Sequence, residues 1–274
     1  MVADNKSEIA EDFLTASLLA RYEATIGGTT GASDCGGYTP HGIHWCLAPP
    51  TTPTEDLRGD GHPKASAILP PVDLPRRMWA SSEVEFHAPL QPGDAVRRVS
   101  QVAGLERKSG SSGELVFVRV LHETSANQTL CVREVQTLVY REQSTNALPL
   151  PSSTGFSGGD FDFSESIHPT PQMLFRYSAL TFNAHRIHYD LEYAQQAEGY
   201  PALVVHGPLM ASLLLKFATR HLGYGAIKKF AFRGRSPAFC GQDLYLGLKL
   251  GAEQHALSIL GADGRLVMSA TIAN

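Results

Sequence analysis

The feature that most constrains the fold of this chain is a succession of strand signals that occurs twice. Residues 83–141 contain four runs of alternating or β-branched residues, separated by short turn sequences. Four runs in the same order and of similar length occupy residues 228–273. Such runs predict an antiparallel meander in each stretch. The same turn residues follow the first run of both stretches: Pro89, Gly93 and Asp94 in the first, and Pro237, Gly241 and Asp243 in the second.

This recurrence predicts two copies of one fold within an α+β chain. Residues 141–160 lie between the copies and are rich in Ser, Thr, Pro and Gly, a composition typical of a surface linker. We therefore expect an N-terminal copy over residues 1–140, a linker over 141–160 and a C-terminal copy over 161–274.

Only the second copy carries a strong helix signal directly before its strands. The apolar segment 205–223 is expected to be a central helix wrapped by a curled sheet, which is the hotdog arrangement. In the first copy, six prolines between residues 50 and 75 exclude a long helix at that place. A shorter helix is predicted over residues 11–26, ended by Gly27 and Gly28. The expectation is a double hotdog of two antiparallel sheets, whose degenerate first half widens a groove and whose second half holds the chemistry.

Composition narrows the class of protein. The chain has 274 residues, a net charge of -4 and 43% hydrophobic residues, which supports a folded core. Without a dense basic cluster, nucleic acid and anionic membrane are not expected as partners. The start of the chain lacks a signal-peptide pattern and no apolar run reaches the ~20 residues of a spanning helix, so the expectation is a cytoplasmic protein. The four cysteines lack CxxC spacing and are expected to be reduced.

The candidate site lies in residues 177–190 and in the helix entry that follows. His185 and His188 are three residues apart and Asn183 precedes them, so a tight turn can direct an amide and an imidazole at one small molecule. At Gly207, the start of the predicted helix offers free N–H groups and the positive end of the helix dipole, which suit a developing oxyanion.

The run from Leu180 to Asp190, L-T-F-N-A-H-R-I-H-Y-D, resembles the hydratase 2 motif of MaoC-like enoyl-thioester hydratases, L-[ST]-G-D-x-N-P-[IV]-H-x-D, without a gap. The later H-G-P-L-M-A is similar to that family's H-G-x-x-x-[AS]. Together with L-P-R-R-M-W at 74–79 and P-L-Q-P-G-D at 89–94, the variant motif resembles the branch of mesaconyl-C4-CoA and itaconyl-CoA hydratases, related to mitochondrial 3-hydroxyacyl-thioester dehydratases. The chain departs from the motif at Asn183, where the family has Asp, and at His185 and Arg186, where the family has Asn-Pro.

The resemblance implies reversible hydration of an α,β-unsaturated acyl-CoA, with a branched C5 dicarboxylic acyl group and citramalyl-CoA as product. His188 would be the general base, Asn183 would orient water or substrate because an amide cannot take a proton, and the Gly207 amide would hold the thioester carbonyl. Four further residues are expected to bind the substrate, the arginines through a free carboxylate: Arg176, Tyr177, His185 and Arg186. CoA is part of the substrate, no separate cofactor is expected, and the family permits a homodimer.

Other interpretations stay open at this point. A helical spacing of His185 and His188 would suit a metal, but no third ligand lies nearby and HExxH is absent, so no metal is expected. His41 and His44 either line the groove or stabilise a loop. The alternatives for function are a 3-hydroxyacyl-thioester dehydratase of fatty-acid synthesis, a hotdog thioesterase and a non-catalytic acyl-binding protein.

Overall fold

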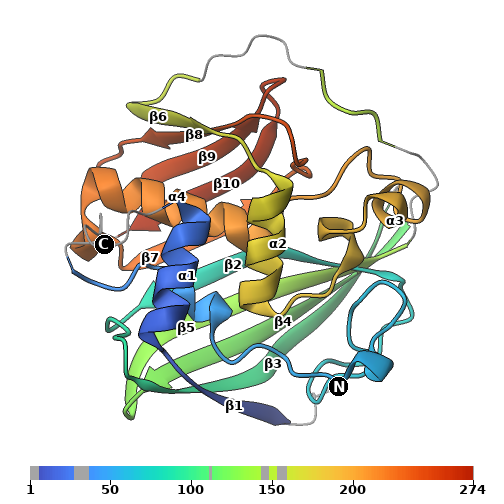
Figure 1. Ribbon diagram of the computed structural model, residues 1–274, viewed down its shortest axis with the longest axis horizontal. Coiled ribbons are helices and arrows are strands. Elements are labelled where there is room, and N and C mark those ends of the chain that lie inside the picture. The colour runs from blue at the N-terminus through green and yellow to red at the C-terminus, as the bar shows by residue number, and fades with distance from the viewer. Residues whose placement is uncertain (1–5, 28–36, 111–112, 143–147, 153–158, 274) are drawn as a thin grey trace.

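The computed structural model describes residues 6–27, 37–110, 113–142, 148–152 and 159–273 (Figure 1). Its strands form one ten-stranded antiparallel sheet in the order β1-β3-β4-β5-β2-β7-β10-β9-β8-β6. The first half supplies β1 (Ser7–Phe13), β2 (Arg76–Phe86), β3 (Ala95–Gly110), β4 (Gly113–Ala126) and β5 (Thr129–Arg141). The second half supplies β6 (Phe163–Ile167), β7 (Lys229–Gly234), β8 (Leu244–Lys249), β9 (His255–Gly261) and β10 (Leu266–Ala273).

All eight strands predicted from alternation are confirmed, but the sheet they form is continuous. Two separate sheets were expected, whereas β2 of the first half pairs with β7 of the second, from Ser81 opposite Arg233 to Glu85 opposite Lys229. The expected similarity of strand length is also wrong, because the strands β2 to β5 run for 11 to 16 residues and β7 to β10 for 6 to 8.

The duplication is confirmed at the level of single hydrogen bonds. Counted outward from the β2–β7 seam, both halves have the same strand order. Helix α1 (Ala16–Ile26) and helix α2 (Pro171–Thr181) are each capped by a threonine side chain, Thr15 and Thr170. In both halves, the glycine of the recurring turn donates to the carbonyl of the residue before that threonine, Gly93 to Leu14 at 2.7 Å and Gly241 to Pro169 at 2.9 Å.

The predicted N-terminal helix begins later than expected. Residues 11–13 belong to strand β1, because their backbone pairs with Ala95 to Arg97 of β3. Thr15 then starts helix α1 by accepting a hydrogen bond from Leu18 N, and Gly27 ends it in the left-handed conformation at φ 83°. The predicted stop at Gly27 is confirmed, and Gly28 lies outside the described residues.

Helix α4 (Gly207–Leu222) is the central helix of the second half and the centre of the core. Ten of its sixteen residues are buried, among them Leu209, Leu214 and Phe217 at 0% exposure. Burying each such side chain contributes roughly 1.5–3 kcal/mol. In the first half, the described residues between 37 and 75 form only two short 3-10 helices, η1 (Ile43–Cys46) and η2 (Thr54–Asp56), as the prolines predict.

Candidate active site

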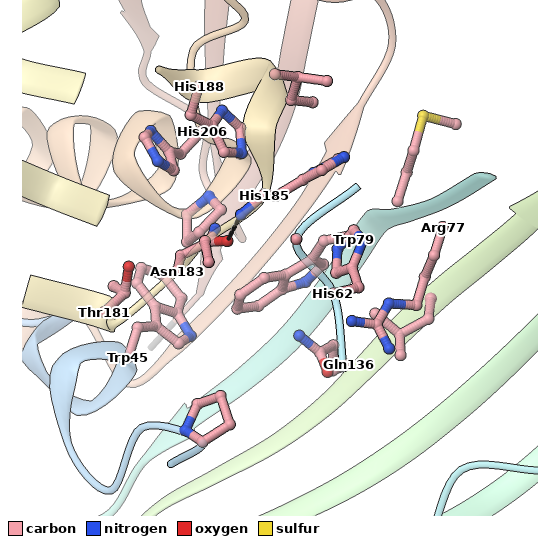
Figure 2. Close-up of a pocket in the computed structure, with 18 of the residues that line it drawn as sticks. Trp45, His62, Arg77, Trp79, Gln136, Thr181, Asn183, His185, His188 and His206 are labelled. Carbon is pink, nitrogen blue, oxygen red and sulfur yellow. Dashed lines mark hydrogen bonds between the residues drawn. The ribbon is translucent and has the colours of Figure 1, made fainter. Parts of the chain in front are cut away.

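A cleft of about 1280 Å³ lies where the two halves meet, and both halves line it. Strands β2, β4 and β5 of the first half form one wall. The turn after helix α2 and the start of helix α4 form the other, and the labelled side chains project from both walls into the space between them (Figure 2). The predicted site residues His185, His188, Asn183 and Gly207 all line this cleft.

The turn after helix α2 is shaped by Asn183. Helix α2 ends at Phe182, whose left-handed backbone (φ 49°, ψ 39°) reverses the chain. The Asn183 side-chain oxygen Oδ1 then accepts a hydrogen bond from His185 N at 3.0 Å, which forms an Asx turn. The 3-10 helix η3 (Arg186–His188) follows directly. Asn183 thus folds the turn with its oxygen, and its NH2 group has no hydrogen bond within the part of the chain that the structure describes.

His188 is held as a neutral imidazole whose Nε2 can accept a proton. Its Nδ1 lies 2.7 Å from the Val204 carbonyl oxygen. A carbonyl only accepts, so Nδ1 carries the hydrogen and Nε2 carries the lone pair. Burial lowers the pKa of His188 to about 4. The ring is therefore uncharged at neutral pH, in the tautomer that a general base requires.

The His206 ring packs against the His188 ring. The two rings are stacked with centroids 3.6 Å apart and an angle of 19° between them (Figure 2). His206 Nε2 lies 2.8 Å from the Ser178 hydroxyl. Burial, followed by the neighbouring imidazoles of His188 and His185, holds the pKa of His206 well below its usual range. A neutral His206 keeps positive charge away from the base, a role that the sequence did not assign, although His206 stands in the H-G-P run.

Gly207 presents a backbone amide at the start of helix α4. The His206 side chain does not cap this helix, and no hydrogen bond within the described residues engages the Gly207 N–H. The first amides of a helix lack internal partners and lie at the positive end of the helix dipole. A Cβ added at Gly207 would meet only the Trp79 carbonyl oxygen at 3.9 Å. Close packing therefore does not require glycine here, and the free N–H is a property of the position that any residue other than proline would keep.

A loop of the first half presses against the turn after helix α2. The Asp60 carbonyl accepts a hydrogen bond from Arg186 N at 2.9 Å. Gly61 has φ 92°, and a Cβ there would overlap the Ala184 carbonyl oxygen, so the close approach requires glycine. The contact brings His62 into the cleft, where its ring centroid lies 4.1 Å from that of His185 (Figure 2).

Three of the predicted substrate-binding residues do not line the cleft: Arg176, Tyr177 and Arg186. Arg176 is exposed on helix α2, and the Tyr177 side chain is fully buried in the core, 5.2 Å from the His206 ring. The Arg186 guanidinium pairs with Asp190 at 2.8 Å, donates to the Gly59 carbonyl at 3.0 Å and lies over the Tyr193 ring. Proximity in sequence to the motif does not give proximity to the cleft, because the helix and the turn point these side chains elsewhere.

The first half contributes cleft residues that the sequence did not single out. Arg77 and Trp79 extend from strand β2, and Trp45 packs edge-on against Trp79 with ring centroids 5.9 Å apart. The sequence signal was the L-P-R-R-M-W run. Of the two histidines left open, His44 lines the cleft, 3.6 Å from Glu134, whereas His41 stacks on Tyr224 outside it.

Two further features, a metal-binding cluster and a membrane-spanning helix, are absent from the described residues. Within the described ranges, no group of three or more His, Cys, Asp or Glu side chains is arranged to hold a metal ion. No helix found in those ranges is both long and apolar enough to cross a membrane.

Known proteins with similar sequences are thioester hydratases and dehydratases. The family model for hydroxyacyl-thioester dehydratase type 2 matches residues 41–240. A mesaconyl-C(4)-CoA hydratase of Chloroflexus aurantiacus is 38% identical over 97% of this chain and 95% of its own. A mitochondrial hydroxyacyl-thioester dehydratase type 2 of Schizosaccharomyces pombe is 30% identical over 86% of this chain and 88% of its own.

Among solved structures, a MaoC-like dehydratase from Phytophthora capsici superimposes with a TM-score of 0.71 at 16% identity, covering 98% of this chain and 96% of the other. At that identity the likeness concerns the fold alone. The predicted double-hotdog fold is confirmed.

Proposed function

Because the chain belongs to the hydroxyacyl-thioester dehydratase type 2 family and is therefore a hydro-lyase, we propose that it hydrates a branched C5 dicarboxylic acyl-CoA reversibly. Mesaconyl-C4-CoA and itaconyl-CoA are the substrates proposed, with citramalyl-CoA as product. The similarity to the Chloroflexus hydratase over nearly the whole of both chains supports this choice.

The observation that carries the proposal is the tautomer of His188 beside the free amide of Gly207. In the proposed mechanism, His188 Nε2 removes a proton from water as the water oxygen attacks the β carbon. The negative charge moves to the thioester oxygen, where the Gly207 N–H stabilises the enolate. The imidazolium then returns its proton to the α carbon, and His188 is neutral again. This mechanism needs no carboxylate at position 183, where the Asn183 amide cannot exchange protons.

Synthesis of fatty acids by dehydration of a 3-hydroxyacyl thioester is the second candidate, and the family name favours it. Buried polar side chains on the inner face of the first-half sheet disfavour the binding of a long alkyl chain in the cleft. Buried Glu134 accepts a hydrogen bond from Trp45 Nε1 at 3.1 Å, and His122 Nδ1 lies 2.8 Å from the Ser100 hydroxyl. Polar groups lining the cleft would lose water to an alkyl chain without gaining partners, which costs free energy. A short polar acyl group meets no such penalty.

The test is incubation of the protein with a panel of unsaturated acyl-CoAs, followed by mass spectrometry. Hydration adds 18 Da to the thioester, thioesterase activity releases free CoA, and a non-catalytic binder changes neither. We expect hydration of mesaconyl-C4-CoA or itaconyl-CoA in preference to long-chain enoyl-CoAs. His188→Ala should lower kcat by ~10²-fold or more, as expected for loss of a general acid/base, whereas His87→Ala, at an exposed position outside the cleft, should not. A His188→Ala variant with more than half of wild-type activity would remove His188 from the mechanism.

A further inference from the structure

Three side chains that can carry positive charge face one part of the cleft, and they come from three separate segments. His62 belongs to the loop of the first half, Arg77 to strand β2 and His185 to the turn after helix α2. The rings of His62 and His185 lie 4.1 Å apart at an angle of 42°. Figure 2 shows His62 between His185 and Arg77, on the side of the cleft away from His206.

The charges in this part of the cleft are not balanced. No hydrogen bond or ion pair with another described residue engages the Arg77 guanidinium, which lines the cleft, whereas the neighbouring Arg76 pairs with Glu198 at 2.8 Å. Burial lowers the pKa of both His62 and His185, and Arg77 adds to the effect on each, so all three groups share one electrostatic environment. The carboxylate of Asp60 is already engaged, 3.4 Å from His62 Nδ1 and 3.6 Å from the Arg58 guanidinium. An incoming anion would therefore meet the unpaired charge of the Arg77 guanidinium, and its own negative charge would raise the pKa of the neighbouring His62 and His185.

We infer that Arg77, His62 and His185 form a subsite for the free carboxylate of the acyl group, an inference that rests on the proposed function. A guanidinium can bind a carboxylate through two parallel hydrogen bonds, and a neutral imidazole adds one donor only where its hydrogen-bearing nitrogen faces the ligand. Because Nδ1 of His62 faces Asp60, His62 donates to the ligand from Nε2 in its protonated form, which a bound anion favours. The His185 ring lies 5.4 Å from the ring of His188. A carboxylate bound beside His185 is then separated from His188 by about the length of a short acyl chain. Binding the carboxylate therefore also positions the double bond of the substrate next to His188.

The same donors could in principle serve a phosphate of CoA, since both ligands are oxyanions. The two sources are separated by truncated substrates. Pantetheine thioesters retain the acyl group and the thioester but carry no phosphate. If the subsite binds the acyl carboxylate, its variants must lose selectivity with pantetheine thioesters as they do with CoA thioesters.

The experiment compares kcat/KM for mesaconyl-C4 and crotonyl thioesters, each on CoA and on pantetheine. The variants are Arg77→Met and His62→Asn. Arg133→Met and His87→Asn are matched controls, because both residues are about half exposed and lie outside the cleft. We expect Arg77→Met to lower the mesaconyl-to-crotonyl ratio by about tenfold or more on both carriers, the effect of losing a charge-assisted hydrogen bond. His62→Asn should lower it less, and the controls should leave it unchanged.

Three results would overturn the inference. If both variants keep the wild-type ratio while the wild type hydrates mesaconyl-C4-CoA, the carboxylate is bound elsewhere and the proposed function stands. If both substrates lose activity equally, or the loss appears only with CoA thioesters, the residues act in folding, in the chemical step or on phosphate. If the wild type hydrates neither substrate, the proposed function itself fails. Thermal unfolding of each variant separates a folding defect from a selective loss.

Discussion

Replacing Gly207 by proline should remove one hydrogen-bond donor from the cleft while leaving the backbone path intact. Gly207 is the first residue of helix α4, a position where proline is favoured because its missing N–H has no helical partner. His206 before it has φ -61° and ψ 134°, the extended conformation that a residue preceding proline prefers. The nearest atom to an added Cβ is 3.9 Å away. The substitution therefore removes the N–H without a clash at Cβ, and the ring carbon Cδ takes the place of the amide hydrogen.

The expected magnitude follows from the role of the amide. Loss of one oxyanion donor typically lowers kcat by about 10² to 10³-fold, roughly 2.7–4 kcal/mol of transition-state stabilisation. Gly207→Ala is the matched control, since it adds a carbon at the same place and retains the N–H. We expect the alanine variant to stay within a few-fold of wild type and the proline variant to fall at least ~10²-fold below it.

The assay is steady-state hydration of mesaconyl-C4-CoA, with circular dichroism and thermal unfolding to establish that both variants fold. A folded Gly207→Pro enzyme with the same kcat/KM as Gly207→Ala would refute the reasoning, because the enolate would then be stabilised by another group.

Four further predictions concern the turn after helix α2 and the loop that presses on it. The pH profile of kcat/KM should stay flat from pH 8 to below pH 6 and lose activity as the pH falls through about 4, because His188 must be neutral to act; a midpoint near 6.5 would contradict its burial. Gly61→Ala should lower the free energy of unfolding by at least ~1–2 kcal/mol, the cost of the left-handed backbone alone. The control Gly59→Ala should not, because a Cβ at Gly59 meets no atom within 4 Å. Equal melting temperatures of the two variants would show that the loop is not held by the contact at Gly61. Arg186→Met should reduce activity on mesaconyl and crotonyl thioesters alike, since its guanidinium is engaged outside the cleft, and a selective loss on mesaconyl would contradict that placement. Asn183→Asp should keep the turn, because a carboxylate accepts the same hydrogen bond, but should weaken turnover of carboxylate-bearing substrates through like-charge repulsion; equal effects on both substrates would show that this position does not sense the carboxylate.

Strand periodicity made most of the fold predictable from the sequence. The eight long or regular strands alternate strongly, and the recurring turn exposed the duplication. The edge strands β1 and β6 were not predicted, because their mostly polar residues give no alternation that stands out from a loop. The joining of the two sheets also escaped prediction, since the pairing of Val84 with Phe230 depends on tertiary packing and leaves no local pattern.

The predicted site residues also differ in how well a local sequence pattern located them. His188, Asn183 and Gly207 were placed in the cleft because a contiguous motif and a helix start carry their positions. Arg176 and Arg186 were assigned from nearness in the chain, and each is directed away from the cleft by helix α2 or by its own ion pair. Arg77 and Trp79, which reach the cleft from strand β2, lie more than a hundred residues before the motif, and no spacing rule connects them to it.

The seam between strands β2 and β7 also determines how such a chain can change. Backbone hydrogen bonds hold it, so substitutions on either side need not separate the halves. A half that needs no reaction site of its own can lose its central helix. The surface that this helix would cover can then line a cleft shared with the other half. The two halves therefore share one asymmetric cleft, lined by the long strands of the first half on one side and by the turn after helix α2 and the start of helix α4 on the other.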